Sequence, residues 1–356
     1  MTITIREMNR FFLLVCAPFI GMVIWLVATH WSVPLSLLPS DPLKTFTLSG
    51  SAVSVDQGLD KAKADAVAIQ GTIEKTFQQY QQSAADMNGM LLLATAQVTR
   101  PDAIFDNRVA AQLGRPTRSI VSPNIDLKLY QFSDPNYKGY ALKVNLKTDN
   151  AMKMALAKDK IGNSETTLDA VRRLGAVAGV NAGGFADDSG GRRYPLSNTI
   201  QGGKFVYGFE PSHDNLAFVG LSTDRKLIGG RFTSQAELDK LKPSFGATFV
   251  PILLQNGAKQ IIPAQWQNSP RRAPRTVIGN FRNDQLLVIV ADGYDERGGS
   301  GATLMELQDR LAALRIRDAY NLDGGGSSSL VVEGQVINKP SDGRLRLLPT
   351  NFLFFK

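Results

Sequence analysis

The stretch Asn321-Leu322-Asp323-Gly324-Gly325-Gly326-Ser327-Ser328-Ser329 is the most informative part of this chain. Three glycines and three serines follow a single acid, a composition typical of a flexible linker. Yet the stretch lies between Ala319-Tyr320 and Leu330-Val331-Val332, which are apolar runs of the kind found in buried strands. We therefore expect a loop inside a packed core, where glycine permits backbone conformations and close approaches that other residues do not.

Two other strand-like runs end in the same way. Ala176–Val180 leads into Asn181-Ala182-Gly183-Gly184, and Leu286–Ala291 leads into Asp292-Gly293. Residues just beyond the carboxyl ends of strands often form the sites of α/β sheets. We therefore predict that Asn181, Asp292 and Asp323 face one cleft.

The surrounding sequence predicts an α+β domain. From about Ile125 onward, short β-rich runs are separated by Gly, Asn and Asp. Two helical patterns interrupt them, one capped by Ser164 and one opened by a capping box of Thr303 and Glu306. This pattern favours a mixed β-sheet domain with a few packed helices over residues 121–356.

The N-terminal residues predict a membrane anchor. Phe11–Thr29 contains 19 residues without a charge, close to the roughly 20 that span a bilayer. Arg6 and Arg10 precede it, which favours a cytoplasmic N-terminus at residues 1–10, a transmembrane helix at 11–30 and an extracytoplasmic remainder. A cleaved signal peptide is the alternative. The expected location is therefore the cell membrane, with a single pass.

Residues 31–120 are expected to form an extracytoplasmic linker followed by a helical segment. Apolar residues spaced by threes and fours form one weak stripe: Leu59, Ala62, Ala66, Ile69, Ile73, Phe77, Tyr80, Ala84 and Met87. Two interpretations remain open. The segment is either a stalk or coiled coil that binds a protein partner, or a helix that lies against its own domain.

Composition excludes several kinds of site. Cys16 is the only cysteine and the chain has two histidines, which excludes disulfides, cysteine metal sites and multi-histidine metal sites. The formal net charge of +8 comes from scattered basic residues, so nucleic acid is the least favoured partner. Anionic lipid and an anionic substrate both fit this charge better.

The predicted cleft has groups suited to a sugar phosphate. Asp292 and Asp323 could divide the acid and the nucleophile or base roles, as carboxylate pairs do in most glycosidases. Backbone N–H groups of the glycine loop could cradle anionic oxygens, and Arg275 could bind phosphate. The two acids with backbone carbonyls could instead hold Ca²⁺ or Mg²⁺, so we assign no certain cofactor.

At these residues the sequence resembles the phosphodiester glycosidase family, which contains the uncovering-enzyme catalytic domain, an N-acetylglucosamine-1-phosphodiester α-N-acetylglucosaminidase. The resemblance covers roughly residues 122–356. It rests on motifs in the expected order: Val180–Phe185, Pro195–Ser197 with Gly202–Lys204, Pro274–Gly279, Val290–Gly293, Asn321–Ser328 and Pro349–Phe352. The chain departs from the family pattern at Ala182 and Ala186.

The resemblance implies a hydrolase that cleaves a sugar-1-phosphate diester between the anomeric carbon and oxygen. We expect the substrate to belong to a cell-envelope polysaccharide or glycoconjugate, such as an exopolysaccharide. The expected catalytic residues are Asp323 and Asp292, and the expected substrate-binding residues are Asn181, Gly183, Gly184, Arg275, Gly324, Gly325, Gly326, Ser327 and Ser328. The alternative is a non-catalytic module that binds envelope glycans in a wall or exopolysaccharide assembly complex.

Overall fold

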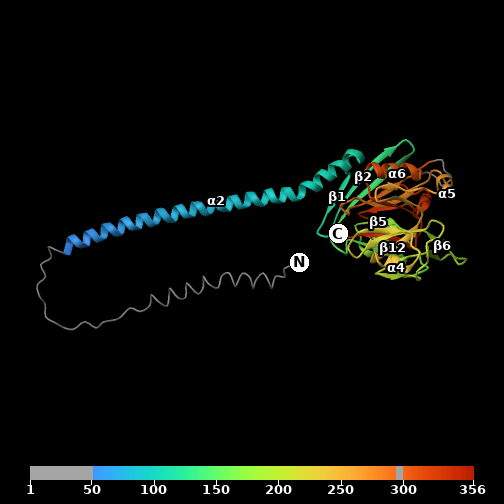
Figure 1. Ribbon diagram of the computed structural model, residues 1–356, viewed down its shortest axis with the longest axis horizontal. Coiled ribbons are helices and arrows are strands. Elements are labelled where there is room, and N and C mark those ends of the chain that lie inside the picture. Colours follow the sequence, from blue (N-terminus) through green and yellow to red (C-terminus); the bar gives the residue numbers. More distant parts are fainter. Residues whose placement is uncertain (1–50, 294–299) are drawn as a thin grey trace, which may run out of the picture. The chain divides into compact units, whose positions relative to one another are not determined.

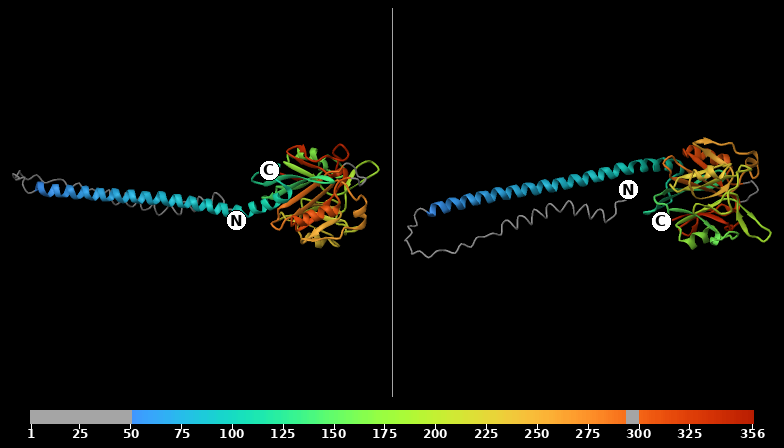
Figure 2. Two further views of the ribbon diagram at one scale, coloured as in Figure 1. Left: turned by 90° about the horizontal axis from the view of Figure 1, so that it is seen from above. Right: turned by 60° about the horizontal axis from the view of Figure 1, so that its bottom comes forward.

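The computed structural model describes residues 51–293 and 300–356. One compact unit comprises Leu92–Lys356, so it begins earlier in the chain than the expected boundary at residue 121. Figures 1 and 2 show this unit as stacked sheets with helices on their outer faces. The mixed α+β class predicted from the sequence is confirmed.

The largest sheet has eight strands in the order β1-β2-β3-β16-β15-β17-β13-β14, and all its pairings are antiparallel. Its strands are β1 (Arg118–Val121), β2 (Ile125–Asp134), β3 (Tyr137–Leu146), β13 (Ile252–Gln255), β14 (Ala258–Lys259), β15 (Arg275–Asn280), β16 (Leu286–Ala291) and β17 (Asp318–Leu322). Strands β15, β16 and β17 are buried along their whole lengths. The centre of this sheet is therefore covered on both faces.

Two five-stranded sheets and a hairpin complete the β structure. The second sheet, in the order β19-β18-β5-β20-β4, contains β4 (Met152–Leu156), β5 (Ala178–Asn181), β18 (Leu330–Val332), β19 (Gln335–Val336) and β20 (Thr350–Phe354). The third, in the order β11-β10-β12-β8-β9, contains β8 (Ile200–Gln201), β9 (Lys204–Phe205), β10 (Ala217–Ser222), β11 (Leu227–Gly230) and β12 (Pro243–Phe249). Strands β6 (Phe185–Asp187) and β7 (Arg193–Pro195) form the hairpin.

The three sheets share one hydrophobic core. Its buried side chains come from β2, β3, β15, β16 and β17 of the large sheet, from the second sheet, and from β10 and β12 of the third. The other face of the large sheet packs against α6 (Leu304–Ala313), while α3 (Thr167–Leu174) and α4 (Gln235–Asp239) cover the two smaller sheets. In Figure 1, α6 and α4 accordingly lie on opposite sides of the domain. Short helices α5 (Ala264–Asn268), η1 (Ala157–Asp159) and η2 (Gly325–Ser327) lie in connections.

The helix signals in the sequence were accurate to within a turn. Thr303 caps α6 in the predicted capping box, accepting from the Glu306 backbone N–H while the Glu306 carboxylate accepts from the Thr303 N–H. The other cap was misassigned. Thr166 rather than Ser164 caps α3, because its side chain accepts from the Asp169 N–H.

Helix α2 (Ser51–Leu113) contains the apolar stripe predicted in the helical segment. Apolar side chains of the stripe such as Leu59, Ile73 and Tyr80 are exposed. Across residues 51–293 and 300–356, no helix combines the length and the apolar character that crossing a bilayer requires. The predicted anchor at residues 11–30 lies outside the described residues.

The last turns of α2 are tied to the large sheet by an ion-pair cluster. The Asp106 carboxylate on α2 contacts Lys128 and lies 2.5 Å from the Nζ atom of Lys143, which is buried. Burial alone would raise the pKa of Asp106, but the hydrogen bonds and charges of the two lysines outweigh it and lower that pKa.

We expect Asp106→Ala to lower the free energy of unfolding by about 2 kcal/mol, because it leaves the buried Lys143 ammonium without its carboxylate. The stabilisation by Asp106 should be full above pH ~4 and be lost as the pH falls through the lowered pKa. Urea unfolding at pH 7 and pH 3 measures both effects. Asp309→Ala removes an exposed partner of Lys259 and is the control, with an expected loss under about 0.5 kcal/mol.

Candidate active site

The strand register brings the two predicted acids to one edge of the large sheet. Strand β15 lies between β16 and β17, with Arg275 opposite Ala291 and Thr276 opposite Leu322. Asp292 follows Ala291 and Asp323 follows Leu322, so the two acids flank the start of β15. Two strand spacings place their backbones roughly 10 Å apart.

Asn181 brings the end of β5 to the same place. Its Nδ2 atom donates to the Asp323 carbonyl over 2.7 Å, and its Oδ1 atom accepts from the Thr276 hydroxyl at 2.8 Å and the Ser329 N–H at 3.1 Å. The three predicted strand ends therefore meet around the start of β15. Asn181 is fully buried, so its side chain positions the loop rather than facing a sugar hydroxyl as expected.

A buried polar network continues behind Asn181. The Thr167 hydroxyl donates to Asn351 Oδ1 over 2.7 Å and lies 2.6 Å from the Ser329 hydroxyl. Because Thr167 has one hydroxyl proton, Ser329 must be the donor in the second bond. Thr167 and Ser329 were not among the predicted residues.

Each of the three glycines of the loop occupies its position for a different structural reason. A Cβ on Gly324 would lie 2.9 Å from the Pro274 carbonyl oxygen. Gly325 has φ +59°, a left-handed conformation that favours glycine. A Cβ on Gly326 would lie 2.2 Å from Nη2 of Arg346 and 2.2 Å from Oδ2 of Asp342. The composition that resembles a linker thus fits a tightly packed turn.

Three of the five loop amides expected to cradle an anion are instead bonded to carbonyl groups of the protein. The N–H of Gly325 donates to the Pro274 carbonyl, that of Ser327 to Gly324, and that of Ser328 to Gly325. The Ser327 and Ser328 hydroxyls are buried, and neither has a hydrogen-bond partner within the described chain. Only Asp323, Gly324 and Gly325 of the loop are partly exposed.

Gly183 and Gly184 are packing positions. A Cβ on Gly183 would lie 2.7 Å from the Ala247 Cβ, and one on Gly184 would lie 2.5 Å from the Phe249 ring. Both are buried, and Gly184 donates its N–H to the Thr248 carbonyl over 3.0 Å. Both glycines are therefore buried in packing contacts and are not exposed to a substrate.

Arg275 is a buried side chain at the start of β15. It pairs with Ala291, so it points to the same face of the sheet as Ala291, toward α6. Its guanidinium is buried and donates to the carbonyls of Pro270, at 2.8 Å, and Ala302, at 3.5 Å. Burial lowers the pKa of Arg275 to about 10, which leaves it a cation at neutral pH. The expected contact with phosphate is not formed by this conformation.

Asp292 has the environment of a proton donor. Burial raises the pKa of its carboxyl group, although the Lys339 N–H and the Asn338 and Tyr140 side chains oppose the shift. Lys339 donates to Oδ1 over 2.9 Å, and Asn338 also donates to the Ser328 carbonyl, which links Asp292 to the glycine loop. These N–H and O–H neighbours suit a carboxyl group better than a divalent cation. Among the described residues, no cluster of three His, Cys, Asp or Glu side chains could hold a metal ion.

We expect Asp292→Asn to stabilise the fold at pH 7 while lowering activity. A raised pKa means that folding favours the neutral carboxyl group, so its ionisation at pH 7 opposes folding. The amide cannot ionise and still offers an oxygen to the Lys339 N–H. The gain in melting temperature should therefore vanish below pH ~4, where both variants are neutral. A lower melting temperature for Asp292→Asn at pH 7 would contradict this expectation.

The structure adds a cation that the sequence analysis did not select. Oδ2 of Asp342 accepts from Nε of Arg346 at 3.1 Å and lies 2.9 Å from its Nη2 atom. The Arg346 side chain is 28% exposed and lies against Gly326, so it is partly open to solvent at the loop. The spacing of Asp342 and Arg346 by four residues was the available signal, but it is common on surfaces.

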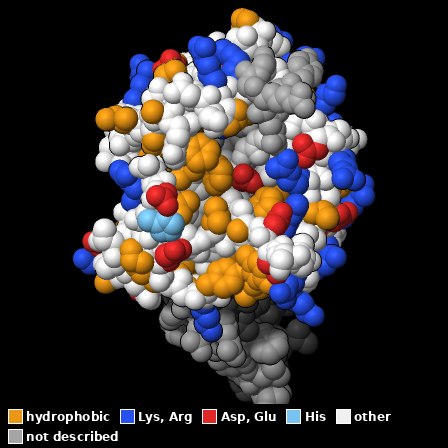
Figure 3. Space-filling model, turned by 90° about the vertical axis from the view of Figure 1, so that its right-hand side faces the viewer, with side chains coloured by type: hydrophobic (Ala, Val, Ile, Leu, Met, Phe, Trp, Pro, Cys, Tyr) orange, Lys and Arg blue, Asp and Glu red, His pale blue; other side chains and the backbone are white. Residues whose placement is uncertain are grey.

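Aromatic side chains border the same region. Phe249, which packs on Gly184, contacts Trp266 with ring centroids 5.9 Å apart. The Arg193 guanidinium lies 4.7 Å from the Phe185 ring centroid and donates to the Leu347 carbonyl, next to Arg346. Figure 3 shows the side of the molecule where β6 and α5 lie, with apolar side chains near its centre and charged ones around them.

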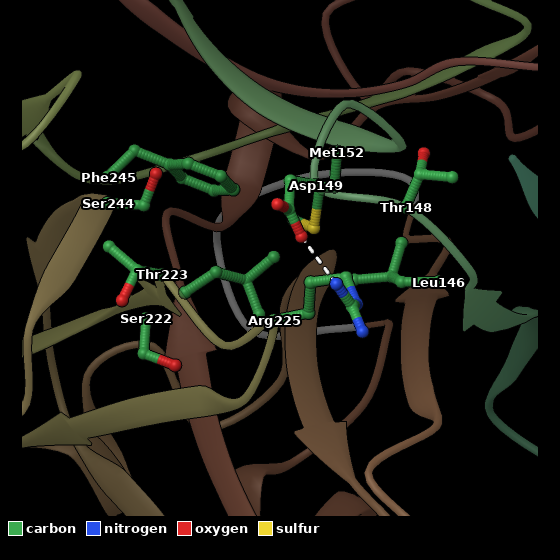
Figure 4. A pocket seen from close by; sticks show the side chains of 10 residues that line it. Leu146, Thr148, Asp149, Met152, Ser222, Thr223, Arg225, Ser244 and Phe245 are labelled. Carbon is green, nitrogen blue, oxygen red and sulfur yellow. Dashed lines mark hydrogen bonds and ion pairs between the residues drawn. The ribbon is translucent and has the colours of Figure 1, made fainter. Parts of the chain in front are cut away.

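Two hollows are lined by other residues, although Tyr140, which neighbours Asp292, lines the larger one. The pocket in Figure 4 has a volume of about 20 Å³, room for about one water molecule, and contains the Arg225–Asp149 ion pair. A larger one, about 280 Å³, lies between β2, β3 and β19 and is lined by residues including Arg118, Gln131 and Tyr140. Neither is lined by a residue predicted for the site. We therefore place the candidate site at the glycine loop on chemical grounds.

Part of this chain is similar to known proteins. Bovine N-acetylglucosamine-1-phosphodiester alpha-N-acetylglucosaminidase is 28% identical over 191 residues, which are 50% of this chain and 35% of that protein. The human protein of the same name is 30% identical over 137 residues, 35% of this chain and 26% of its own length. This chain therefore spans about a third or less of the relatives that it matches.

A solved structure shares the fold. The zebrafish N-acetylglucosamine-1-phosphodiester alpha-N-acetylglucosaminidase catalytic domain, auto-inhibited by its pro-peptide, superposes with a TM-score of 0.55 at 20% identity, over 68% of this chain and 86% of that one. The family described as phosphodiester glycosidase matches residues 174–355, a narrower range than the expected 122–356. Because this match covers just over half of the 356 residues, the chain belongs to the phosphodiester glycosidase family.

Proposed function

We propose that this protein hydrolyses a sugar-1-phosphate diester by breaking the bond between the anomeric carbon and the bridging oxygen. The observation that carries the proposal is the convergence of Asp323 and Asp292 at the start of β15, inside the segment that matches the family. The names of the relatives support the same reaction class. We further propose that the substrate belongs to the cell envelope.

The roles of the two acids follow from their surroundings. Asp292, with its raised pKa, is the proton donor. Asp323 acts at the anomeric carbon, either by taking a proton from the attacking water or by direct attack. In both cases a water oxygen finally bonds to the anomeric carbon, and the carbon–oxygen bond to phosphate breaks. The phosphate monoester leaves with the electron pair.

The aromatic side chains near the loop provide the sugar surface. Phe249 packs on Gly184 and contacts Trp266, and Phe185 lies on the adjacent hairpin. Ligand pockets commonly combine such apolar walls with a few polar groups that fix orientation.

The test uses a synthetic α-linked N-acetylglucosamine-1-phosphate diester in water enriched in ¹⁸O. Hydrolysis at the anomeric carbon places the label in the released sugar, whereas hydrolysis at phosphorus places it in the phosphate. Label in the sugar supports the proposal. Label found only in the phosphate, or no release at all from a panel of sugar-1-phosphate diesters, contradicts it.

The alternative is a module that binds envelope glycans without cleaving them. It is favoured by the burial of Asn181, Gly183 and Gly184, which leaves few of the predicted contacts available to a sugar. Saturable binding of the same diesters, without release of sugar, would support this alternative.

We also propose that residues 11–30 anchor the protein in the cell membrane, with the glycosidase domain outside the cytoplasm. The proposal rests on the uncharged run Phe11–Thr29 and the two arginines before it. A protein partner bound through the apolar stripe of α2 would fit the exposure of that stripe. Protease accessibility of the domain in intact spheroplasts tests the orientation.

A further inference from the structure

We propose that Arg346, held by Asp342 against Gly326, is the group that binds the phosphate of the substrate. This inference rests on the proposed function and names the residue that recognises the charged part of the substrate. The resemblance led us to expect Arg275 and the loop amides in this role. In the structure, Arg275 and the amides of Gly325, Ser327 and Ser328 donate to carbonyl groups of the protein.

A phosphate leaving group places a particular demand on the site. A phosphate monoester has a second pKa near 6, so most of its negative charge remains on its oxygens as it departs at neutral pH. It needs a positive charge that stabilises the negative charge developing on its oxygens. A guanidinium group suits this task, because it remains charged and its planar edge matches two phosphate oxygens.

Arg346 is positioned for this task. Gly326, on which its guanidinium lies, is three residues from Asp323, so the backbones of these two residues are at most about 10 Å apart. Asp342 Oδ2 contacts both Nε and Nη2 of the guanidinium and so fixes its orientation beside the loop. The Arg346 side chain is also partly exposed, unlike that of Arg275.

Gly326 provides the independent observation. Its φ does not require glycine, since it is not among the positive-φ glycines. The atoms that a Cβ would meet are Nη2 and Cζ of Arg346 and Oδ2 of Asp342, which are the ends of flexible side chains and could move away. An alanine would therefore fold, but it would displace this ion pair. Glycine at this position is explained by the placement of Arg346 rather than by the backbone.

The experiment compares two substrates that carry the same sugar. One is the N-acetylglucosamine-1-phosphate diester, and the other is 4-nitrophenyl α-N-acetylglucosaminide, whose leaving group carries no phosphate. In the full-length protein, Arg346→Ala should lower kcat/KM for the diester by about 50-fold, the effect of one hydrogen-bonded charge. Activity on the nitrophenyl glycoside should stay within about threefold.

Three further variants make the result specific. Gly326→Ala should reproduce the selective loss with an unchanged melting temperature. Arg346→Lys should retain part of the diester activity, because it keeps the charge but loses the planar edge. Arg344→Ala removes the same charge from an exposed position two residues away and should change neither activity. Equal losses on both substrates, or no loss on the diester, would overturn the assignment.

A binding measurement separates this inference from the proposed reaction. If the wild type cleaves neither compound, the proposed reaction fails, and N-acetylglucosamine-1-phosphate is titrated against the same variants by calorimetry. Binding that weakens in Arg346→Ala and Gly326→Ala, but not in Arg344→Ala, supports Arg346 as the phosphate site. Equal binding by all variants, or no binding by the wild type, overturns it.

Discussion

Asp323→Asn should reduce kcat for the sugar-1-phosphate diester by about 10³-fold or more, with the fold intact. The backbone of residue 323 is held in the loop at both of its polar groups: the N–H donates to the Ala182 carbonyl at 3.2 Å, and the carbonyl accepts from Asn181. An asparagine keeps both groups and the side-chain shape. It loses the negative charge that activates water or attacks the anomeric carbon.

Initial rates and a thermal melt of the same preparation measure the two halves of this expectation. Asp309→Asn, an exposed acid, is the control for a simple loss of charge. Wild-type turnover by Asp323→Asn on a confirmed substrate would remove Asp323 from catalysis. A drop in melting temperature that matches the drop in activity would point to a structural role instead.

The stereochemistry of the product reports the distance between the two carboxyl groups during the reaction. Carboxyl groups about 5–5.5 Å apart predict retention through a glycosyl-enzyme, and about 6.5–9.5 Å predicts inversion by water. Two strand spacings between the backbones allow both, because aspartate side chains can lean together or apart. Proton NMR of the first sugar released distinguishes the two anomers. If Asp323 is the nucleophile, azide should rescue Asp323→Ala and form a glycosyl azide.

Asn181→Ala should lower the free energy of unfolding by about 3 kcal/mol. The substitution leaves the Thr276 hydroxyl, the Ser329 N–H and the Asp323 carbonyl without their described partner, and the site is fully buried. Buried polar groups that lose their partners cost more than the mean value of a hydrogen bond. Activity should fall as well, because the same amide fixes the Asp323 backbone.

Urea unfolding of the purified variants measures this effect. Asn150→Ala, at an exposed position in a turn, is the matched control and should change stability by less than about 0.5 kcal/mol. Asn181→Asp separates the two halves of the network, since it keeps an acceptor for Thr276 but cannot donate to Asp323. A loss below about 1 kcal/mol in Asn181→Ala would show that the three elements are held together by other contacts.

The fold class and the place of the site could be predicted from local pattern. Apolar β-rich runs, the Thr303–Glu306 capping box and three strands that end in a short polar residue and glycine all depend on neighbours in the sequence. Such patterns predict the structure correctly because strand ends and helix starts are set by a few adjacent residues. Thr166 replaced Ser164 as a cap, an error of two residues.

The choice of cation could not be predicted in this way. Every residue of β15 is buried, so apolar residues occupy both of its faces and no alternation reveals where Arg275 points. The register with β16 and β17 settles it, and directs Arg275 toward α6. Arg346 lies twenty residues after Gly326 in the sequence, and only the return of the chain past the loop places its guanidinium there.

The sequence by itself determined that a glycine loop follows a buried strand and bears an acid, and that this chain resembles one family of glycosidases. The tertiary structure decided which side chains meet at that loop and which ones hold it in place through hydrogen bonds. The reason is that backbone preferences are local, whereas a hydrogen-bond partner or a neighbouring charge is fixed by strand register and by the crossing of distant segments. Asn181, which was expected to bind the substrate, therefore fixes the loop through its hydrogen bonds. Arg346, which no sequence pattern pointed to, is the cation that lies against the loop.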